Sequence, residues 1–258
     1  MKLNLLIGSR NYAVDHFEPL DISLPVTFDG KSATAFGAPP ARKDTFTSGA
    51  FTGDVNAGGS CNCELYTFAP HLHGTHTECV GHIADEAIAV TNIIGNTLIP
   101  ATLVTVAPEI ASESYDPPLD PNDMTVTMAA LEEALEDADH DFLAALIIRT
   151  DSHDLDEPPF FSAEAMKFIS SLPVAHLLTD LPSVDRRDDG GKLSNHRIFW
   201  GVPPGVTAIE APSSRTITEM IRTPKTVPDG RYLLDLQVAP LVCDAAPSRP
   251  VLYSLREV

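Results

Sequence analysis

The chain has 258 residues, 43% of them hydrophobic and 21% charged, a composition typical of a globular protein that is long enough to bury a core. It carries 36 acidic against 17 basic residues, which gives a formal net charge of −19 at pH 7. Because so acidic a surface repels phosphate backbones and anionic lipids, we expect neither nucleic acid nor a membrane surface as a partner.

Short runs of branched and apolar residues recur along the whole chain, which is typical of strands separated by turns. The predicted strands are Lys2–Ile7, Ala101–Val106, Ala144–Arg149, Val174–Leu178, Thr207–Glu210 and Tyr232–Val238. Two helices are predicted where apolar residues recur at helical spacing behind an N-cap residue. They cover Met128–Ala138 after Thr127 and Ala163–Leu172 after Ser162. Strands and helices are interspersed, so we predict an α/β fold.

The 22 prolines are spread over the whole chain, which indicates many short elements with tight connections. Longer loops are expected at 38–45, 115–123 and 185–192. The last of these is charged and contains two glycines; we interpret it as a surface connection, with a mobile lid as the alternative. No shift in composition divides the chain, so residues 1–258 are expected to form a single domain.

No run reaches the roughly 18 uncharged apolar residues of a membrane helix. The first apolar run stops after Ile7 without a small-residue cleavage site, which favours a first strand over a secretory signal. The four cysteines form no C-x-x-C pair, and with no export signal they indicate reduced thiols in the cytoplasm. We expect Cys79 to be a small buried residue, with a thiolate ligand or a Cys–His nucleophile as the alternatives.

Four of the nine histidines fall in the segment HLHGTHTECVGH, which runs from His71 to His82 and also contains Glu78. Clustered imidazoles raise one another's charging penalty, and a divalent cation removes that penalty by accepting their lone pairs. The segment therefore predicts a metal site.

Spacing within the segment supports this prediction. His76 and Glu78 are two residues apart, so on an extended backbone they project from the same face. His71 and His73 form a similar pair, and Gly74 allows the turn that would bring both pairs together. Imidazole and carboxylate ligands suit zinc, manganese or iron(II) rather than calcium. The spacing differs from H-E-x-x-H, so a zincin is not indicated.

The segment resembles the signature H-x-G-T-H-x-D-x-P-x-H of the cyclase-type metal hydrolases, the family of bacterial kynurenine formamidase and isatin hydrolase. The matching residues are Gly74, Thr75, His76 and His82, with Glu78 at the Asp position. Similar matches follow in order along the chain: Asp21-Ile-Ser23, Ile148-Arg-Thr150, Asp180-Leu-Pro-Ser183 with His196, and Thr218-Glu219. The resemblance implies a mixed, barrel-like β-sheet with flanking helices and a homodimer or larger homo-oligomer.

The chain also departs from the signature, which indicates a divergent branch. The first metal-binding histidine of the family would fall on Leu72, and either His71 or His73 could replace it; we favour His71. Glu78 is one methylene longer than the family's aspartate, and Val80 stands at the proline position.

The resemblance also implies roles for two distant residues. It makes His196 a metal ligand or acid–base residue and Glu219 a metal ligand; without it, they would be an ordinary strand histidine and a helix surface residue. Trp200 either walls an aromatic substrate pocket or packs in the core. The apolar surroundings of His176 indicate the core. The acidic neighbours of the three remaining histidines indicate the surface: His16, His140 and His153.

Together these features predict a hydrolase that uses one or two divalent ions, zinc or manganese. Such an ion lowers the pKa of bound water from roughly 15.7 to about 7 and polarises a carbonyl group. His71 or His73, His76 and Glu78 are expected to hold the first ion. His82, His196 and Glu219 are expected to complete a second site or transfer protons.

Three functions remain open at this stage. The first is hydrolysis of a small, kynurenine-formamidase-like amide, the second is opening of a cyclic amide or lactone as in isatin hydrolase, and the third is metal binding without catalysis.

Overall fold

The computed structural model describes residues 3–152 and 154–258, so Lys2 of the first predicted strand and His153 lie outside the described residues. The strands are β1 (Leu3–Ile7), β2 (Arg10–Asp21), β3 (Arg42–Thr45), β4 (Thr47–Ser48), β5 (Phe51–Thr52), β6 (Glu64–Thr67), β7 (His76–Cys79), β8 (Leu98–Thr105), β9 (Glu109–Ile110), β10 (Met124–Val126), β11 (Ala145–Arg149), β12 (Phe160–Phe161), β13 (His176–Thr179), β14 (Thr216–Glu219), β15 (Gly230–Val238) and β16 (Ala245–Glu257). The α-helices are α1 (Val90–Ile93), α2 (Met128–Ala134), α3 (Ala163–Ser171) and α4 (Ser194–Trp200), and the 3₁₀ helices are η1 (Val55–Ala57), η2 (Pro70–Leu72), η3 (Val80–Ile83) and η4 (His140–Phe142).

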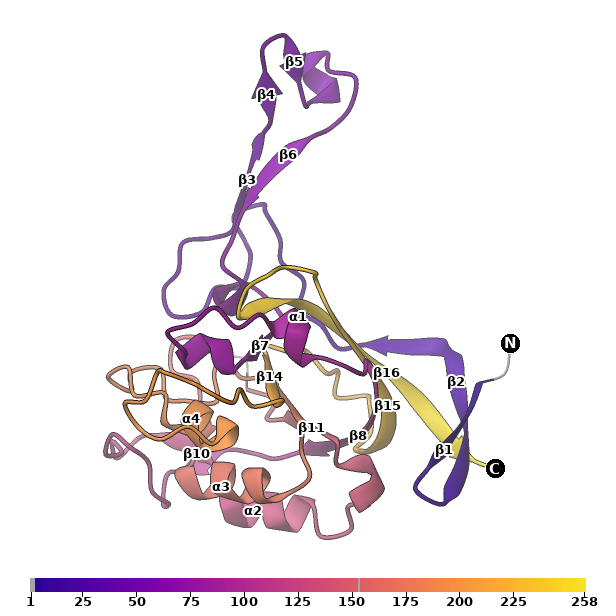
Figure 1. Cartoon of the computed structure of the whole chain (residues 1–258), viewed down its shortest axis with the longest axis vertical. Coiled ribbons are helices and arrows are strands. Elements are labelled where there is room, and N and C mark those ends of the chain that lie inside the picture. Colours follow the sequence, from indigo (N-terminus) through magenta and orange to yellow (C-terminus); the bar gives the residue numbers. More distant parts are fainter. Residues whose placement is uncertain (1–2, 153) are drawn as a thin grey trace.

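A mixed β-sheet forms the body of the molecule (Figure 1). Its strand order is β1-β2-β16-β15-β8-β11-β13-β14-β7, and β7 also pairs with β16. This extra pairing closes the seven strands from β16 to β7 into a barrel, and β2 and β1 extend the sheet beyond β16. The predicted α/β class with a barrel-like core is therefore confirmed.

Strand β11 is buried on both of its faces, so its consecutive side chains, which point to opposite sides of the sheet, enter two different clusters. On β11, Leu146 and Ile148 pack in the cluster that faces the helices, together with Met166 of α3 and Phe199 of α4. The alternate residues Ala145 and Ile147 belong to a second cluster, with Leu103 of β8 and Leu234 of β15, inside the barrel.

The two predicted helices form behind the expected caps. The Thr127 side chain accepts a hydrogen bond from the backbone of Ala130, and that of Ser162 accepts one from the backbone of Ala165. Helix α2 ends earlier than predicted, because Leu135 leaves the helical conformation with a ψ of 6°.

Other elements differ from the prediction. The segment Thr207–Glu210 is mostly exposed and forms no strand; Thr207 O accepts a backbone hydrogen bond from Asp85, which lies in a loop and not in a strand. The predicted loop at 38–45 contains β3, which pairs with β6 in an arm that projects from the body (Figure 1). The long strands β2 and β16 were not predicted, since their polar, half-exposed sequences lack a continuous apolar run.

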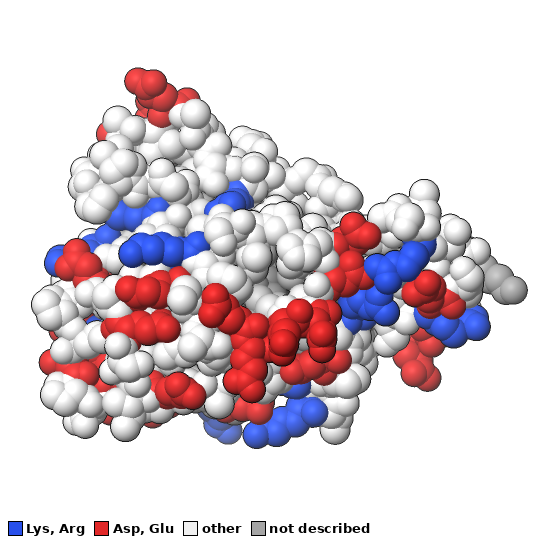
Figure 2. All heavy atoms as spheres, turned by 90° about the horizontal axis from the view of Figure 1, so that it is seen from below, with Lys and Arg blue, Asp and Glu red and all other residues white. Residues whose placement is uncertain are grey.

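The acidic composition is displayed on the molecular surface. In the view from below, Asp and Glu side chains form broad groups with fewer Lys and Arg side chains among them (Figure 2). Within the described residues, no helix has the length and apolar character required to cross a membrane.

Candidate metal centre

The centre of the candidate site is the antiparallel pair of strands β7 and β14. Their register places His76 opposite Glu219 and Glu78 opposite Ile217. Paired residues share a face of the sheet, so both candidate ligands of β7 lie on the side on which Ile217 packs against the helices. The distance from His76 Nε2 to Glu219 Oε2 is 3.4 Å.

The Gly74–Thr75 dipeptide fixes the start of β7. Gly74 has a φ of +78°, and a Cβ atom there would lie 2.6 Å from the carbonyl oxygen of Leu24, so only glycine fits without a shift. The Thr75 hydroxyl accepts a hydrogen bond from Leu24 N (2.7 Å) and donates one to Met220 O (2.6 Å). This residue therefore joins the segment after β2 to the residue that follows Glu219.

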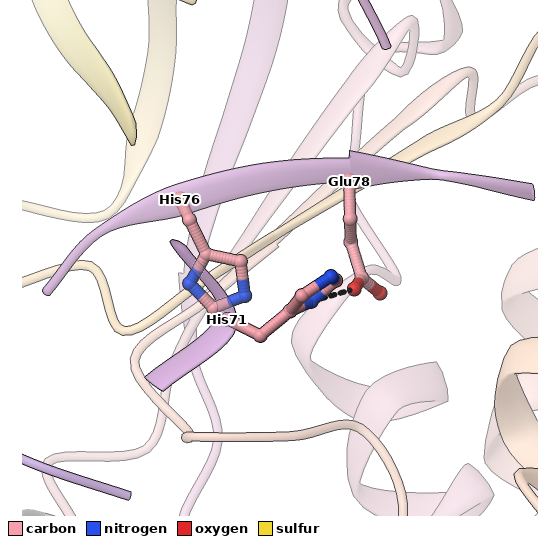
Figure 3. A group of neighbouring side chains, drawn as sticks. All are labelled: His71, His76 and Glu78. Carbon is pink, nitrogen blue, oxygen red and sulfur yellow. Dashed lines mark ion pairs between the residues drawn. The ribbon is translucent and has the colours of Figure 1, made fainter. Parts of the chain in front are cut away.

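His71 reaches the same place from the 3₁₀ helix η2. Its Nδ1 lies 2.9 Å from Glu78 Oε2, and its ring centroid lies 5.4 Å from that of His76. Figure 3 shows His76 and Glu78 projecting from β7 towards the imidazole of His71.

The structure does not bring His73, the other residue predicted as a ligand, to this cluster. Its Nδ1 lies 3.0 Å from the carbonyl oxygen of Ala69, and its Nε2 lies 2.9 Å from that of Pro39. Both ring nitrogens thus face main-chain carbonyl groups at the base of the arm. We therefore keep His71 and not His73 as the candidate ligand.

His196 approaches from α4 rather than from a strand. Its Nε2 lies 2.8 Å from Glu78 Oε1 and 3.6 Å from Glu219 Oε1. Trp200, one helical turn later, is buried, with its ring centroid 5.2 Å from that of His196. Trp200 therefore packs in the core beside the candidate ligand.

The sequence did not indicate the residue that holds His196 in place. Asp185 Oδ2 lies 2.6 Å from His196 Nδ1, and its other oxygen accepts hydrogen bonds from the Tyr115 hydroxyl and from Asn195 N. Asp185 is buried, although it begins a charged segment that we interpreted as a surface connection. The only sequence signal was its position two residues after the Asp180–Ser183 match.

His82, on η3, contacts a second residue that the sequence did not single out. Its Nδ1 lies 3.3 Å from Asp244 Oδ2, and the same oxygen lies 2.8 Å from His71 Nε2. The His82 ring centroid is 4.2 Å from that of His71 and 5.6 Å from that of His196.

Glu219 is held from both sides. Its Oε1 accepts a hydrogen bond from the backbone of Val184. The next residue, Met220, has a φ of +57°, a backbone conformation that is uncommon outside glycine, and its carbonyl group is bound by Thr75. Val184, which follows the Asp180–Ser183 match, thus binds the Glu219 carboxylate, and Thr75 holds the main chain directly after it.

The donor set fits a cation. Within the described residues, four buried side-chain atoms face one another and make no hydrogen bond: His76 Nε2, Glu78 Oε1, Glu78 Oε2 and His196 Nε2. Both Glu78 oxygens lie within 2.9 Å of an imidazole nitrogen, but these contacts lack hydrogen-bond geometry. Buried carboxylate and imidazole atoms without hydrogen bonds are costly, and a cation bound among them would satisfy all of these atoms.

The described residues offer three groups that could hold an ion. Each group presents ligand atoms that all lie within 4.8 Å of one another. The groups are His71, His76 and Glu78; His71, His82 and Asp244; and Glu78, His82 and His196.

Electrostatics in the site favour positive charge. Burial opposes ionisation of Glu78, but attraction to His196 and His82 outweighs it and lowers the pKa of Glu78 well below its ordinary value. Burial likewise opposes charging of His71, but its contacts with Asp244 and Glu78 raise its pKa to about 10. The His71 imidazole therefore carries a proton at neutral pH in the metal-free protein, and a cation would displace this proton on binding.

Cys79 lies on the other face of β7, with its thiol 3.5 Å from the carbonyl oxygen of Ile88. Burial raises the pKa of this thiol to about 11. The residue is therefore a small buried thiol, as predicted, and not a thiolate ligand or nucleophile.

Comparison with known proteins assigns a family to the chain. The family model named Cyclase matches residues 20–186, more than half of the chain, including the histidine segment. No curated protein sequence matches the chain.

Solved structures share the fold at low sequence identity. A potential metal-dependent hydrolase with cyclase activity is 16% identical with a TM-score of 0.59, over 92% of this chain and 98% of that chain. An isatin hydrolase with bound product analogue thioisatinate is 12% identical with a TM-score of 0.62, over 93% of each chain. Isatin hydrolase A from Labrenzia aggregata, with bound benzyl benzoate, is 14% identical with a TM-score of 0.63, over 92% of this chain and 93% of that chain. With the family model matched across the signature segment, this chain belongs to the Cyclase family.

Proposed function

We propose that this protein is a divalent-metal-dependent hydrolase that cleaves an amide or related acyl bond of a small substrate. The observation that carries the proposal is the convergence of His71 with His76, Glu78 and His196. The ligand atoms of the last three residues are buried, face one another and make no hydrogen bond. Such a donor set is costly to bury unless it holds a cation, and imidazole with carboxylate suits zinc or manganese.

The residues divide into two ligand groups. His71, His76 and Glu78 would hold one ion, because each contributes a donor atom to the same group. A second ion would be held by His196 and Glu219 with Glu78, whose two oxygens face opposite sides of the site. A bound ion would supply an activated water molecule and polarise the scissile carbonyl.

Proton transfer is assigned to His82. Its side chain is 28% exposed, whereas those of His76 and His196 are buried, so it alone of these three can exchange protons with solvent. Its ring lies close to those of His71 and His196, beside both ligand groups. A histidine in this position can accept a proton from water and return it to the leaving group.

Two substrate classes fit this chemistry. We propose an N-formyl or similar small amide as the substrate, following the resemblance to kynurenine formamidase. Ring opening of a cyclic amide or lactone is the second candidate, favoured by the structural similarity to isatin hydrolases. Both reactions need the same activated water, so the residues above serve either one.

The proposal is tested by metal analysis and by activity. Purified protein is expected to contain stoichiometric zinc or manganese and to hydrolyse N-formylkynurenine faster than isatin. His76→Ala is expected to lose both metal and activity, whereas the control His140→Ala, at an exposed position on η4, is expected to keep them. Metal without activity on either substrate class would favour a metal-binding protein without catalysis. Metal-free protein with full activity would refute the proposal.

We also propose that the protein forms a homodimer or larger oligomer, as the resemblance implies. The projecting arm exposes large apolar side chains that a partner would cover, among them Val55, Leu65 and Tyr66. Light scattering of the purified chain tests this directly, and a monomer at micromolar concentration would contradict it.

A further inference from the structure

Asp244 lies between β15 and β16, far in sequence from the histidine segment. Its main chain is fixed on both sides, because Cys79 N donates to Asp244 O (3.0 Å) and Val90 N donates to Cys243 O (2.9 Å). The first residues of β16 then pair with β7, and Ala245 lies opposite Glu78. Asp244 is therefore held beside the ligands by backbone contacts.

The Asp244 carboxylate makes its closest contact with His71. The distance from His71 Nε2 to Asp244 Oδ2 is 2.8 Å, against 3.3 Å to Nδ1 of His82. A neutral imidazole carries one N–H donor and one acceptor nitrogen. Once a cation has displaced the proton of Nδ1, Nε2 still donates to Asp244 and Nδ1 presents its lone pair to the site, beside Glu78 Oε2 at 2.9 Å.

His196 shows the same arrangement on the other side of Glu78. Its Nδ1 contacts Asp185, while its Nε2 faces Glu78. In metal sites, a carboxylate behind a ligating imidazole fixes the tautomer and the orientation of the ring. Glu78 is thus flanked by two histidines, each with a carboxylate on its far side.

His71 has the greater need of such a contact. It lies on the short 3₁₀ helix η2, and its side chain is 25% exposed. By contrast, His76 is fully buried and its Nδ1 contacts Gly74 O. Without Asp244, the imidazole of His71 would be free to turn towards solvent, which would remove a donor from the first ligand group.

We propose that Asp244 is a positioning residue that fixes His71 as a metal ligand and thereby compensates for the leucine at position 72. This inference rests on the proposed metal-dependent function. The carboxylate does not bind the ion itself in this arrangement; it sets which nitrogen of His71 faces the site.

The test compares Asp244→Asn with the matched control Asp235→Asn. Asp235 lies on β15, and its carboxylate accepts hydrogen bonds from the Gln237 side chain. Both variants and the parent protein are stripped with a chelator and titrated with Co²⁺. Asp244→Asn is expected to raise the dissociation constant about 10- to 100-fold and to change the visible spectrum of bound cobalt, because the ligand set changes. Asp235→Asn is expected to match the parent in both measurements.

A second comparison separates the two histidines that Asp244 contacts. If Asp244 acts through His71, the Asp244→Asn substitution weakens Co²⁺ binding by the same factor in the His82→Ala variant as in the parent protein, because the free-energy effects of independent substitutions are additive. Loss of the effect in that background would overturn the inference, as would a parent-like dissociation constant and spectrum for Asp244→Asn. The proposed function fails separately, if the parent protein itself binds no Co²⁺.

Discussion

Thr75→Val tests whether one hydroxyl group holds the site together. Valine has nearly the same shape, so the change removes the bond from Leu24 N and the bond to Met220 O without creating a cavity. Thr75 and Met220 are buried, so the Met220 carbonyl group loses its partner away from water, whereas Leu24 N lies at a half-buried position. An unsatisfied buried group costs roughly 1–3 kcal/mol, so we expect a loss of about 1–3 kcal/mol in the free energy of unfolding.

The matched control is Thr125→Val on β10. Thr125 is also buried, but its hydroxyl has no hydrogen-bond partner within the part of the chain that the structure describes. Removing an unpaired buried hydroxyl is expected to leave the protein as stable or more stable.

Both variants are measured by urea denaturation of the chelator-treated protein. Thr75→Val is also expected to weaken metal binding, because Met220 follows Glu219 directly. If Thr75→Val unfolds within about 0.5 kcal/mol of the parent, the hydroxyl does not hold the site and the reasoning is wrong.

Three further predictions concern individual side chains. Burial lowers the pKa of His176 to about 4. As the pH drops, His176 therefore becomes protonated in the unfolded chain at a higher pH than in the folded protein. The free energy of unfolding should fall by up to about 3 kcal/mol between about pH 6.5 and pH 4. His176→Asn should lack that part of the pH dependence in urea denaturation, and an unchanged profile would contradict the assignment. His73→Gln should keep the metal stoichiometry of the parent whereas His71→Ala should lower it, and the reverse result would identify His73 as the ligand. Cys79→Ala should retain metal and activity. In the native protein, Cys79 should resist alkylation at neutral pH while the exposed Cys61 reacts, and mass spectrometry of the labelled peptides shows which of these two cysteines is modified.

The sequence predicted the helices and strands whose formation depends on neighbouring residues, such as an N-cap residue or a continuous apolar run. The helix at Ala163–Ser171 follows its Ser162 cap, and the buried strand Ala145–Arg149 is a continuous apolar run, so both could be placed from the sequence. Strand β16 could not, because its residues are half-exposed and it forms only by pairing with β2, β15 and β7. Its pairing with β7 also closes the barrel.

The same division applies to the candidate site. His76 and Glu78 were predicted to share a face because the two-residue period of a strand is a local property, and the structure places them so. The choice between His71 and His73 was not determined by spacing, because η2 turns the chain between them and directs the two rings to different surroundings.

The sequence by itself therefore determined the kinds of candidate ligand, their order and the strand that presents two of them, since these follow from side-chain chemistry and backbone period. Only the tertiary structure decided which carboxylates lie behind the imidazoles. Asp185 is brought to His196 by the turn before α4, and Asp244 is brought to His71 by the closure of the barrel across 173 residues of sequence. Such contacts depend on long-range strand pairing, for which no short segment carries a signal.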